Sequence, residues 1–214
     1  IYLYMDRVEK ANDNAEYLFR YVSSKADKIK HYFIINKQSK DFDRLKKYGK
    51  VVPYGSRKHK FLLLNSDKLI SSHADELVLN PLGKMEKYYR DLIDYKFIFL
   101  QHGVIQNDLS TWLNKFNKNI KKFITSSEME KKSILNGNYN YDEENVIVTG
   151  LPRFDNLVNK SKKQILIIPT WRKYLAGKIN KKLERNYNPN FVKSMYYKQY
   201  NKLINDKHFL SYLK

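Results

Sequence analysis

The stretch Lys-Phe-Ile-Phe-Leu-Gln-His-Gly at residues 96–103 joins the most apolar predicted strand of the chain to a polar turn. Four consecutive large apolar residues, Phe97–Leu100, predict a strand that is buried on both faces, as the inner strands of parallel sheets are. Gln101, His102 and Gly103 follow this strand without a spacer. Ligands of open parallel sheets bind at the carboxyl ends of the strands, so the stretch predicts both a fold class and the place of a site.

An apolar run followed by an amphipathic segment recurs on both sides of this stretch. Further strands are predicted at Ile1–Met5, Tyr32–Ile35, Val51–Tyr54, Lys68–Ser72, Phe123–Thr125, Val146–Thr149 and Ile165–Ile168. Helices are predicted at Asn12–Val22, Ser39–Tyr48, Lys58–Asn65, Ser110–Phe116, Ser126–Leu135, Phe154–Val158 and Phe191–Leu213. This alternation predicts an α/β fold in which a parallel sheet carries helices on both faces.

The composition fits a globular protein that does not span a membrane. The chain has 214 residues, of which 42% are hydrophobic, and this share is enough for a core. The absence of cysteine excludes a disulfide scaffold, a cysteine nucleophile and cysteine-ligated metal sites. No apolar run reaches the roughly 18 residues that a membrane-spanning helix needs. We expect the chain to be a piece of a longer protein, because Ile1 stands in a predicted strand and Lys214 in a predicted helical pattern.

The formal net charge of +19 is concentrated in the last quarter of the chain. Residues 159–214 hold 14 basic and two acidic residues, whereas the first 158 residues hold 27 and 20. A domain boundary is therefore predicted near Asn159–Lys163, with Ile165–Ile168 opening a second domain. Such a charge attracts polyanions: nucleic acid, anionic lipid or a phosphate-rich substrate. A charge that serves only solubility is the alternative.

Two histidines follow predicted strands directly. At the carboxyl edge of the sheet, His102 could act as a general base on a hydroxyl, because the pKa of an imidazole lies near neutrality. Gly103 beside it would let a ligand approach the backbone closely. The alternative for His102 is a structural role, in which it caps the next helix or bonds a nearby carbonyl. His73 has the same placement and is the second candidate. The other histidines are predicted to be surface or helix-face residues: His31, His59 and His208.

Two arginines lie just past predicted strands, in the segments Gly-Leu-Pro-Arg-Phe-Asp (150–155) and Pro-Thr-Trp-Arg (169–172). A guanidinium group at such a place can hold a phosphate through two hydrogen bonds, and the Thr170 hydroxyl can add a donor. Arg153 and Arg172 are therefore candidate phosphate-binding residues. For Arg153 an ion pair with Asp155 is the alternative. Trp171 is predicted to anchor a core or a domain interface.

The sequence shows no signature of a metal or cofactor site. Asp41-Phe42-Asp43 has the Asp-x-Asp spacing of metal-dependent sugar transferases, but it opens a predicted helix, where carboxylates complement the helix dipole. The seven glycines form no phosphate-binding loop, and no Gly-x-Ser-x-Gly marks a serine nucleophile. No metal ion and no cofactor are expected.

In order and separation, His102-Gly103, Gly150–Asp155 and Pro169–Arg172 resemble motifs of the CDP-glycerol glycerophosphotransferase family, the teichoic-acid polymerases and primases of Gram-positive walls and related capsule polymerases. The segments Met5–Glu16 and Ile70–His73 resemble one branch of that family. The resemblance implies a two-domain GT-B fold with the active site between two Rossmann-like halves. It also implies transfer of glycerol phosphate from CDP-glycerol to a growing polyol-phosphate chain at the membrane surface, with release of CMP.

Carried over by position, the resemblance makes His102 the base for the acceptor hydroxyl. The substrate- and phosphate-binding candidates are then Gly103, Arg153, Asp155, Thr170, Arg172 and His73. Residues 1–158 would form the N-terminal acceptor domain, and residues 159–214 the truncated start of the donor, nucleotide-binding domain. The implied partners are CDP-glycerol or a similar CDP-activated donor and an anionic polyol-phosphate or capsule acceptor. The implied location is the cytoplasm, with peripheral contact to the anionic inner face of the bacterial cell membrane.

The chain departs from the family pattern in two respects. The usual His-Gly-Thr with a following lysine is here His102-Gly103-Val104 with Gln106. A His-Pro motif and a Thr-Asp-Tyr-Ser-Ser segment, which by resemblance help to hold the donor pyrophosphate, do not occur. We therefore expect these 214 residues alone to bind the donor poorly and to turn over little or nothing.

Two other functions stay open at the level of sequence. The basic tail is compatible with a non-catalytic protein that binds a polyanion, either nucleic acid or an anionic membrane. Nucleic acid is the less favoured partner, because the resemblance makes phosphate in a donor or acceptor polymer the favoured anion. A GT-B glycosyltransferase that uses a nucleotide sugar is the alternative among enzymes.

Overall fold

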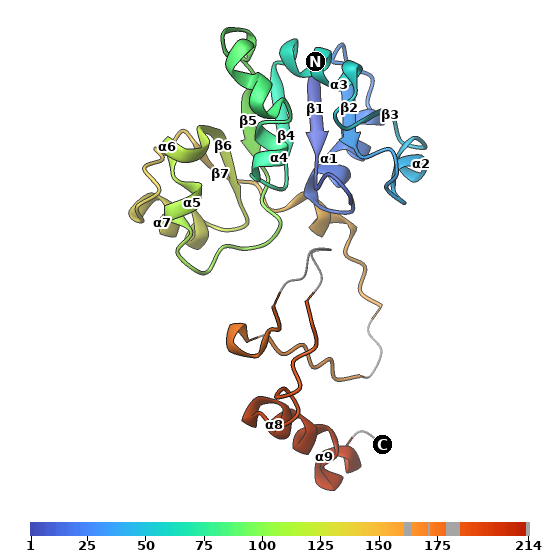
Figure 1. Ribbon diagram of the computed structural model, residues 1–214, viewed down its shortest axis with the longest axis vertical. Helices are drawn as coiled ribbons and strands as arrows, with labels where there is room; N and C mark the ends of the chain where they lie inside the picture. Colours follow the sequence, from blue (N-terminus) through green and yellow to red (C-terminus); the bar gives the residue numbers. More distant parts are fainter. Residues whose placement is uncertain (161–163, 171, 179–184, 213–214) are drawn as a thin grey trace. The chain divides into compact units, whose positions relative to one another are not determined.

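The computed structural model describes residues 1–160, 164–170, 172–178 and 185–212 (Figure 1). The chain forms two compact units, Ile1–Leu157 and Val158–Lys214. The first unit holds the sheet. Among the described residues of the second unit, the regular elements are the helices η4 Lys173–Leu175, α8 Met195–Ile204 and α9 Lys207–Ser211.

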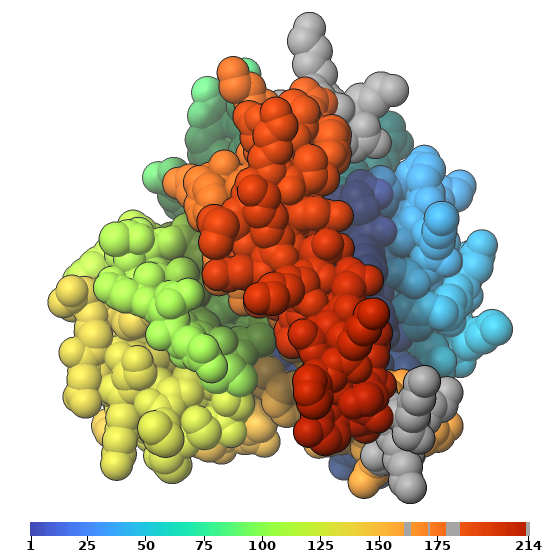
Figure 2. All heavy atoms as spheres, turned by 90° about the horizontal axis from the view of Figure 1, so that it is seen from below, coloured from blue at the N-terminus to red at the C-terminus, as the bar shows by residue number. Residues whose placement is uncertain are grey.

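The first unit is built on one parallel sheet of seven strands in the order β3-β2-β1-β4-β5-β6-β7. The strands are β1 Tyr2–Met5, β2 His31–Ile35, β3 Lys50–Pro53, β4 Lys68–Ser71, β5 Lys96–Phe99, β6 Ile120–Thr125 and β7 Val146–Val148. The blue segments around β3 and the yellow segments around β7 lie at opposite sides of this unit in Figure 2. Strand β1 pairs with β2 on one side and with β4 on the other. The strand order therefore reverses between β1 and β4, the position at which doubly wound sheets bind ligands.

Helices cover both faces of this sheet. They are α1 Asn14–Ser23, α2 Phe42–Leu45, α3 Arg57–Leu64, α4 Glu76–Leu79, η1 Gly83–Tyr88, η2 Arg90–Leu92, α5 Ser110–Leu113, α6 Lys115–Lys118, α7 Glu128–Asn136 and η3 Pro152–Asn156. Helices α1 and α2 share one apolar core with Tyr4 and Phe33, whereas α3, α4, α5 and α7 share a second core with Leu3 and Ile34. Successive residues of one strand thus enter opposite cores, because side chains alternate along a strand. The predicted parallel α/β fold is confirmed.

Strand β5 is covered on both faces, as its sequence predicts. Phe97 and Phe99 enter the core on the α3 side, and they are 3% and 2% exposed. Leu100, just past the strand, enters the core on the α1 side together with Ile124 of β6. The side chains of the apolar run therefore anchor this strand in both cores, and the polar turn at Gln101–Gly103 begins directly after them.

The helices predicted at Ser110–Phe116 and Phe191–Leu213 are each divided into two by a polar residue. Asn114 accepts hydrogen bonds from the backbone N–H groups of Phe116 and Asn117, so it ends α5 and caps α6. Asp206 accepts from Phe209 in the same way and caps α9. Short side chains with a carbonyl or carboxyl oxygen compete for backbone donors, which makes them helix starts rather than helix interiors.

The strand predicted at Ile165–Ile168 is wrong. This segment has no regular structure, and the side chains of Ile165 and Ile168 are 59% and 78% exposed. A strand needs a neighbouring strand to take up its backbone N–H and C=O groups. No described residue of the second unit forms a ladder with this segment. Among the described residues, the apolar side chains of this segment therefore have no sheet to pack into.

His59, predicted to be a surface or helix-face residue, lies on α3 and is buried inside the first unit. Its side chain is on α3 with a residue exposure of 1%, and its Nδ1 accepts a hydrogen bond from the backbone N–H of Gly55 at 3.0 Å. Burial lowers the pKa of His59 to about 4, and Lys60 adds to this effect. The imidazole is therefore neutral in the folded protein at neutral pH.

The burial of neutral His59 predicts a loss of stability in mild acid. The pKa of His59 is about 4 in the folded state against 6.5 for the ordinary side chain, so the unfolded chain binds the proton more readily between these values. The free energy of unfolding should fall as the pH is lowered through this range, by up to about 1.4 kcal/mol per pH unit. Urea unfolding of the wild type and of His59→Gln measures this slope, which should be shallower in the variant. Equal slopes would contradict the assignment, and His208→Gln is the control.

Candidate active site

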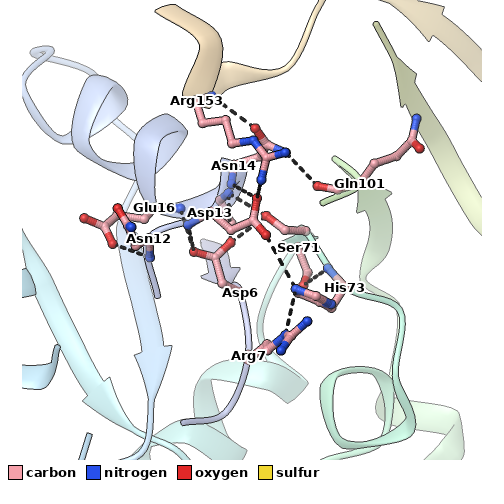
Figure 3. Close-up of polar contacts among 12 residues, drawn as sticks. Asp6, Arg7, Asn12, Asp13, Asn14, Glu16, Ser71, His73, Gln101 and Arg153 are labelled. Atoms are coloured by element: carbon pink, nitrogen blue, oxygen red, sulfur yellow. Dashed lines mark hydrogen bonds and ion pairs between the residues drawn. The ribbon is translucent and has the colours of Figure 1, made fainter. Parts of the chain in front are cut away.

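The loops that follow β1, β4, β5 and β7 bring two histidines and two arginines together at the carboxyl edge of the sheet. Figure 3 shows three of these residues, Arg7, His73 and Arg153, around Asp13. The rings of His73 and His102 stack with 4.7 Å between their centroids and 8° between their planes. His73 is buried, whereas His102 is exposed on the outer side of the pair. The structure therefore joins the first and second histidine candidates into one pair, which their separation in the sequence does not reveal.

Arg7 fixes the proton position of His73. Its Nε donates to Nε2 of His73 at 3.3 Å. Because a guanidinium group can only donate, Nε2 of His73 is the acceptor and the ring proton is assigned to Nδ1. That nitrogen lies 3.8 Å from the carboxylate of Asp75. The ring of His73, the inner one of the pair, is thus held by Arg7 at Nε2.

Arg153 enters the same cluster from the loop after β7. Its Nη1 donates to Oδ1 of Asp13 at 3.0 Å, and the other oxygen of Asp13 lies 3.6 Å from Nε2 of His73. A Cβ placed on Gly103 would lie 3.9 Å from Nη2 of Arg153, which is ordinary contact. The structure therefore assembles His73, His102, Gly103 and Arg153.

Asp155 does not join this cluster. Its exposed side chain lies on η3, and Arg153 pairs with Asp13 instead of Asp155. Gly150, which opens this turn, has a φ of +78°, a conformation that glycine adopts without the steric cost of a Cβ. The Gly-Leu-Pro-Arg segment thus turns the chain so that Arg153, and not Asp155, reaches the histidine pair.

Asp6 occupies the N-terminus of α1. This buried carboxylate accepts from the backbone N–H groups of Asp13 and Ala15 at 3.0 Å each, and from the Ser72 hydroxyl at 2.5 Å. Burial raises the pKa of Asp6 to about 6, against these hydrogen bonds, so the group is still mostly ionised at pH 7. The first backbone donors of α1 are consequently used inside the protein and are not open to a phosphate.

A buried polar framework holds the turn that carries His102, and no local sequence pattern points to it. Gln101 has a φ of +60°, which is uncommon outside glycine. Asn14 binds it from α1, because its Nδ2 donates to the Gln101 carbonyl at 2.7 Å while its Oδ1 accepts from the backbone N–H of Arg153 at 3.1 Å. One fully buried amide thus ties the His102 turn to the Arg153 turn.

Glu130 braces the other side of this turn. Its Oε1 accepts from Gln101 Nε2 at 3.1 Å and from the backbone N–H of Ile105 at 2.7 Å, so it holds the turn both before and after His102. Its Oε2 accepts from the backbone N–H and the hydroxyl of Ser126 at 2.7 and 2.8 Å. Glu130 is 4% exposed. Its role becomes visible only in the folded structure, where α7 lies beside the turn that follows β5.

The surroundings of His102 favour the neutral imidazole. Desolvation lowers the pKa of His102, the neighbouring His73 lowers it further, and Arg7 and Arg153 act in the same direction. Asp13 opposes them. A neutral imidazole on the exposed side of the pair is the form that can accept a proton from a hydroxyl.

The remaining candidates lie in the second unit. Arg172 donates from Nη1 to the Thr170 carbonyl at 3.3 Å and lies over the Tyr196 ring, 5.3 Å from its centroid. The Tyr196 hydroxyl donates to the same carbonyl at 2.7 Å. The exposed Thr170 and Arg172 are thus held together beside α8, and Trp171 lies outside the described residues. The expected assignment of the two units to acceptor and donor domains stays a prediction.

Two pockets flank the histidine pair. One, of about 190 Å³, lies between the loop after β1 and His73, and the other, of about 150 Å³, lies between His102 and the segment up to Leu113. Within the part of the chain that the structure describes, no group of three or more acidic or histidine side chains could hold a metal ion. None of the described helices has the length and apolar character needed to cross a membrane.

The fold places the chain in a known structural class. It is similar to a solved structure of a variant of the wall teichoic acid polymerase TagF, with a TM-score of 0.51 and 15% sequence identity. The similarity covers 74% of this chain and 40% of that one. The parallel sheet, its reversal at β1 and β4 and this likeness define a Rossmann-like domain of the GT-B type.

Sequence comparison identifies the family. Residues 1–210 match the CDP-glycerol:poly(glycerophosphate) glycerophosphotransferase family. The whole chain is also 53% identical, over 216 aligned residues, to the minor teichoic acid biosynthesis protein GgaB of Bacillus subtilis (strain 168). The chain therefore belongs to the CDP-glycerol:poly(glycerophosphate) glycerophosphotransferase family, a family of transferases. It spans 24% of the length of GgaB.

Proposed function

We propose that the protein transfers glycerol phosphate, or a related polyol or sugar phosphate, from a CDP-activated donor to a growing wall teichoic acid or capsule polymer, with His102 as the base. The observation that carries this proposal is the stacked histidine pair, in which the outer imidazole is exposed and desolvation lowers its pKa. Family membership supports the reaction class. The proposed acceptor is an anionic polyol-phosphate or capsule chain.

The proposed chemistry is a direct displacement at the β-phosphorus of the donor. His102 takes the proton of an acceptor hydroxyl as its oxygen forms a bond to that phosphorus. The bond from the β-phosphorus to the bridging oxygen breaks, and CMP leaves with the electron pair. Positioning and charge stabilisation supply most of the catalysis of phosphoryl transfer. Arg153, held by Asp13 beside the pair, and Arg172 and Thr170 of the second unit are the proposed phosphate partners.

We further propose that the polymer is made at the inner face of the cell membrane. The net positive charge of the protein would favour peripheral contact with this anionic surface. Residues 1–158 would bind the acceptor and residues 159–214 would begin the donor domain. The chain spans 24% of the length of GgaB. We therefore also propose that residues outside this chain complete donor binding. Substantial CMP release from CDP-glycerol by these 214 residues alone would contradict that last point.

A donor panel over a range of pH tests the proposed function. In the protein that contains this chain, CMP release should depend on a polyol-phosphate acceptor and should be faster with CDP-glycerol or another CDP-polyol than with a nucleotide sugar. The acid limb of the rate should lie below pH 6.5, because the lowered pKa of His102 keeps the base neutral to a lower pH. Transfer from nucleotide sugars alone would support the glycosyltransferase alternative. Salt-sensitive binding to any polyanion without transfer would support the non-catalytic one.

A further inference from the structure

The loop between β1 and α1 turns its backbone donors inward. The N–H of Ala11 donates to Oδ2 of Asp41 at 3.0 Å, and the N–H of Asn12 donates to Oε2 of Glu16 at 2.6 Å. The N–H of Asp13 donates to Asp6. Three successive amides are therefore used by carboxylates of the protein, and this loop cannot cradle a diphosphate with its backbone as glycine-rich loops do.

Two of the three carboxylates that hold the loop, Glu16 and Asp41, share one cation. Arg44 donates to both oxygens of Glu16 and also to Oδ1 of Asp41 at 3.0 and 3.1 Å. Glu16 is fully buried. This cluster ties the loop to α1 and α2, and Arg44 offsets part of the negative charge of Glu16 and Asp41.

Two cations of the loop face the pocket of about 190 Å³ that also borders His73. Arg7 uses its Nε on His73, which orients the guanidinium group, while its two Nη groups have no hydrogen bond or ion pair to any residue that the structure describes. The same holds for Nζ of Lys10 in the described part of the chain. The charge of Arg7 also acts on His102, so the pocket lies within electrostatic reach of the proposed base.

We propose that Arg7 and Lys10 form a subsite for one phosphodiester of the acceptor polymer, behind the hydroxyl that His102 deprotonates. This inference rests on the proposed function. A singly charged diester suits the pocket better than a doubly charged terminal phosphate, because the carboxylates of Asp6 and Asp13 also line it. His73 separates this subsite from His102, so the diester lies on one side of the histidine pair and the reacting hydroxyl on the other.

Binding of defined acceptors to the full chain tests the subsite. The probes are synthetic glycerol-phosphate oligomers with one or several phosphodiesters, inorganic phosphate, an oligonucleotide, and vesicles with or without phosphatidylglycerol. Arg7→Gln and Lys10→Gln should each weaken oligomer binding about tenfold, which corresponds to roughly 1.4 kcal/mol. Lys37→Gln removes an equal charge from an exposed position and should leave binding unchanged. Lys10→Gln does not touch His73, so its effect cannot come from a disturbed histidine pair.

The possible results separate this subsite from the proposed function. Equal losses in Lys10→Gln and Lys37→Gln, or none, overturn the subsite. So does binding of inorganic phosphate, of phosphatidylglycerol vesicles or of an oligonucleotide that is as tight and as sensitive to Arg7→Gln as that of the oligomer. In the transferase assay, Arg7→Lys should restore most of the acceptor affinity that Arg7→Gln loses. If His102→Ala transferred normally and still bound the oligomer selectively, the proposed role of His102 as the base would be rejected, and the proposed phosphodiester subsite would stand.

Discussion

His102→Ala is expected to lower transfer to the polymer by roughly 100- to 10,000-fold, the range that a positioned general base contributes. The acceptor hydroxyl would have to lose its proton to water, while donor and acceptor contacts stay in place. Because His102 is exposed and its ring stacks on that of His73, the free energy of unfolding should change little. CMP release measured at saturating donor and acceptor, with circular dichroism of the same samples, gives both quantities.

His208→Ala is the matched control for this variant. His208 is also an exposed histidine stacked on an aromatic ring, Tyr212, but it lies on α9 of the second unit. The His208→Ala variant should transfer glycerol phosphate at the wild-type rate. If His102→Ala kept more than about a tenth of the wild-type rate with an intact fold, His102 would not be the base. Acceptor binding should persist in His102→Ala, since the loss concerns proton transfer and not the phosphodiester contacts.

The strand positions of the first unit could be predicted because each strand carries its own signal. The apolar run at Phe97–Leu100 predicts a strand with two covered faces, and both cores receive its side chains. His102, Gly103 and Arg153 could likewise be proposed, because each stands just after a strand. These inferences need only the local sequence and the rule that parallel strands end at one edge.

The contacts that organise the site could not be predicted, because they join residues far apart in the chain. Asp13 and Arg153 are separated by 140 positions, and Asn14 reaches Gln101 across 87. In a helical pattern, Asn14 and Glu130 look like polar residues of a first turn. The opposite error concerns Ile165–Ile168, whose local sequence predicts a strand although no described neighbour pairs with it. Local pattern cannot supply a pairing partner.

Glu130→Ala is expected to destabilise the first unit by about 3 kcal/mol, because it leaves the buried donor of Gln101 and the half-buried donors of Ile105 and Ser126 without their charged acceptor. The same change should lower the transfer rate at least tenfold at saturating substrate, since Gln101 and Ile105 bracket His102. Urea unfolding followed by circular dichroism measures the first effect, and CMP release well below the unfolding midpoint measures the second.

Two further variants decide whether Glu130 acts through the His102 turn. Glu128→Ala removes an exposed carboxylate from the same first turn of α7, so it should change stability by less than about 0.5 kcal/mol. Glu130→Gln keeps one acceptor oxygen and should recover part of both losses. A purely structural role predicts that the rate per folded molecule is unchanged in Glu130→Ala. A lower rate with an unaltered Michaelis constant for the acceptor would instead place the defect in the proton transfer that His102 performs, because the phosphodiester contacts lie on the other side of His73.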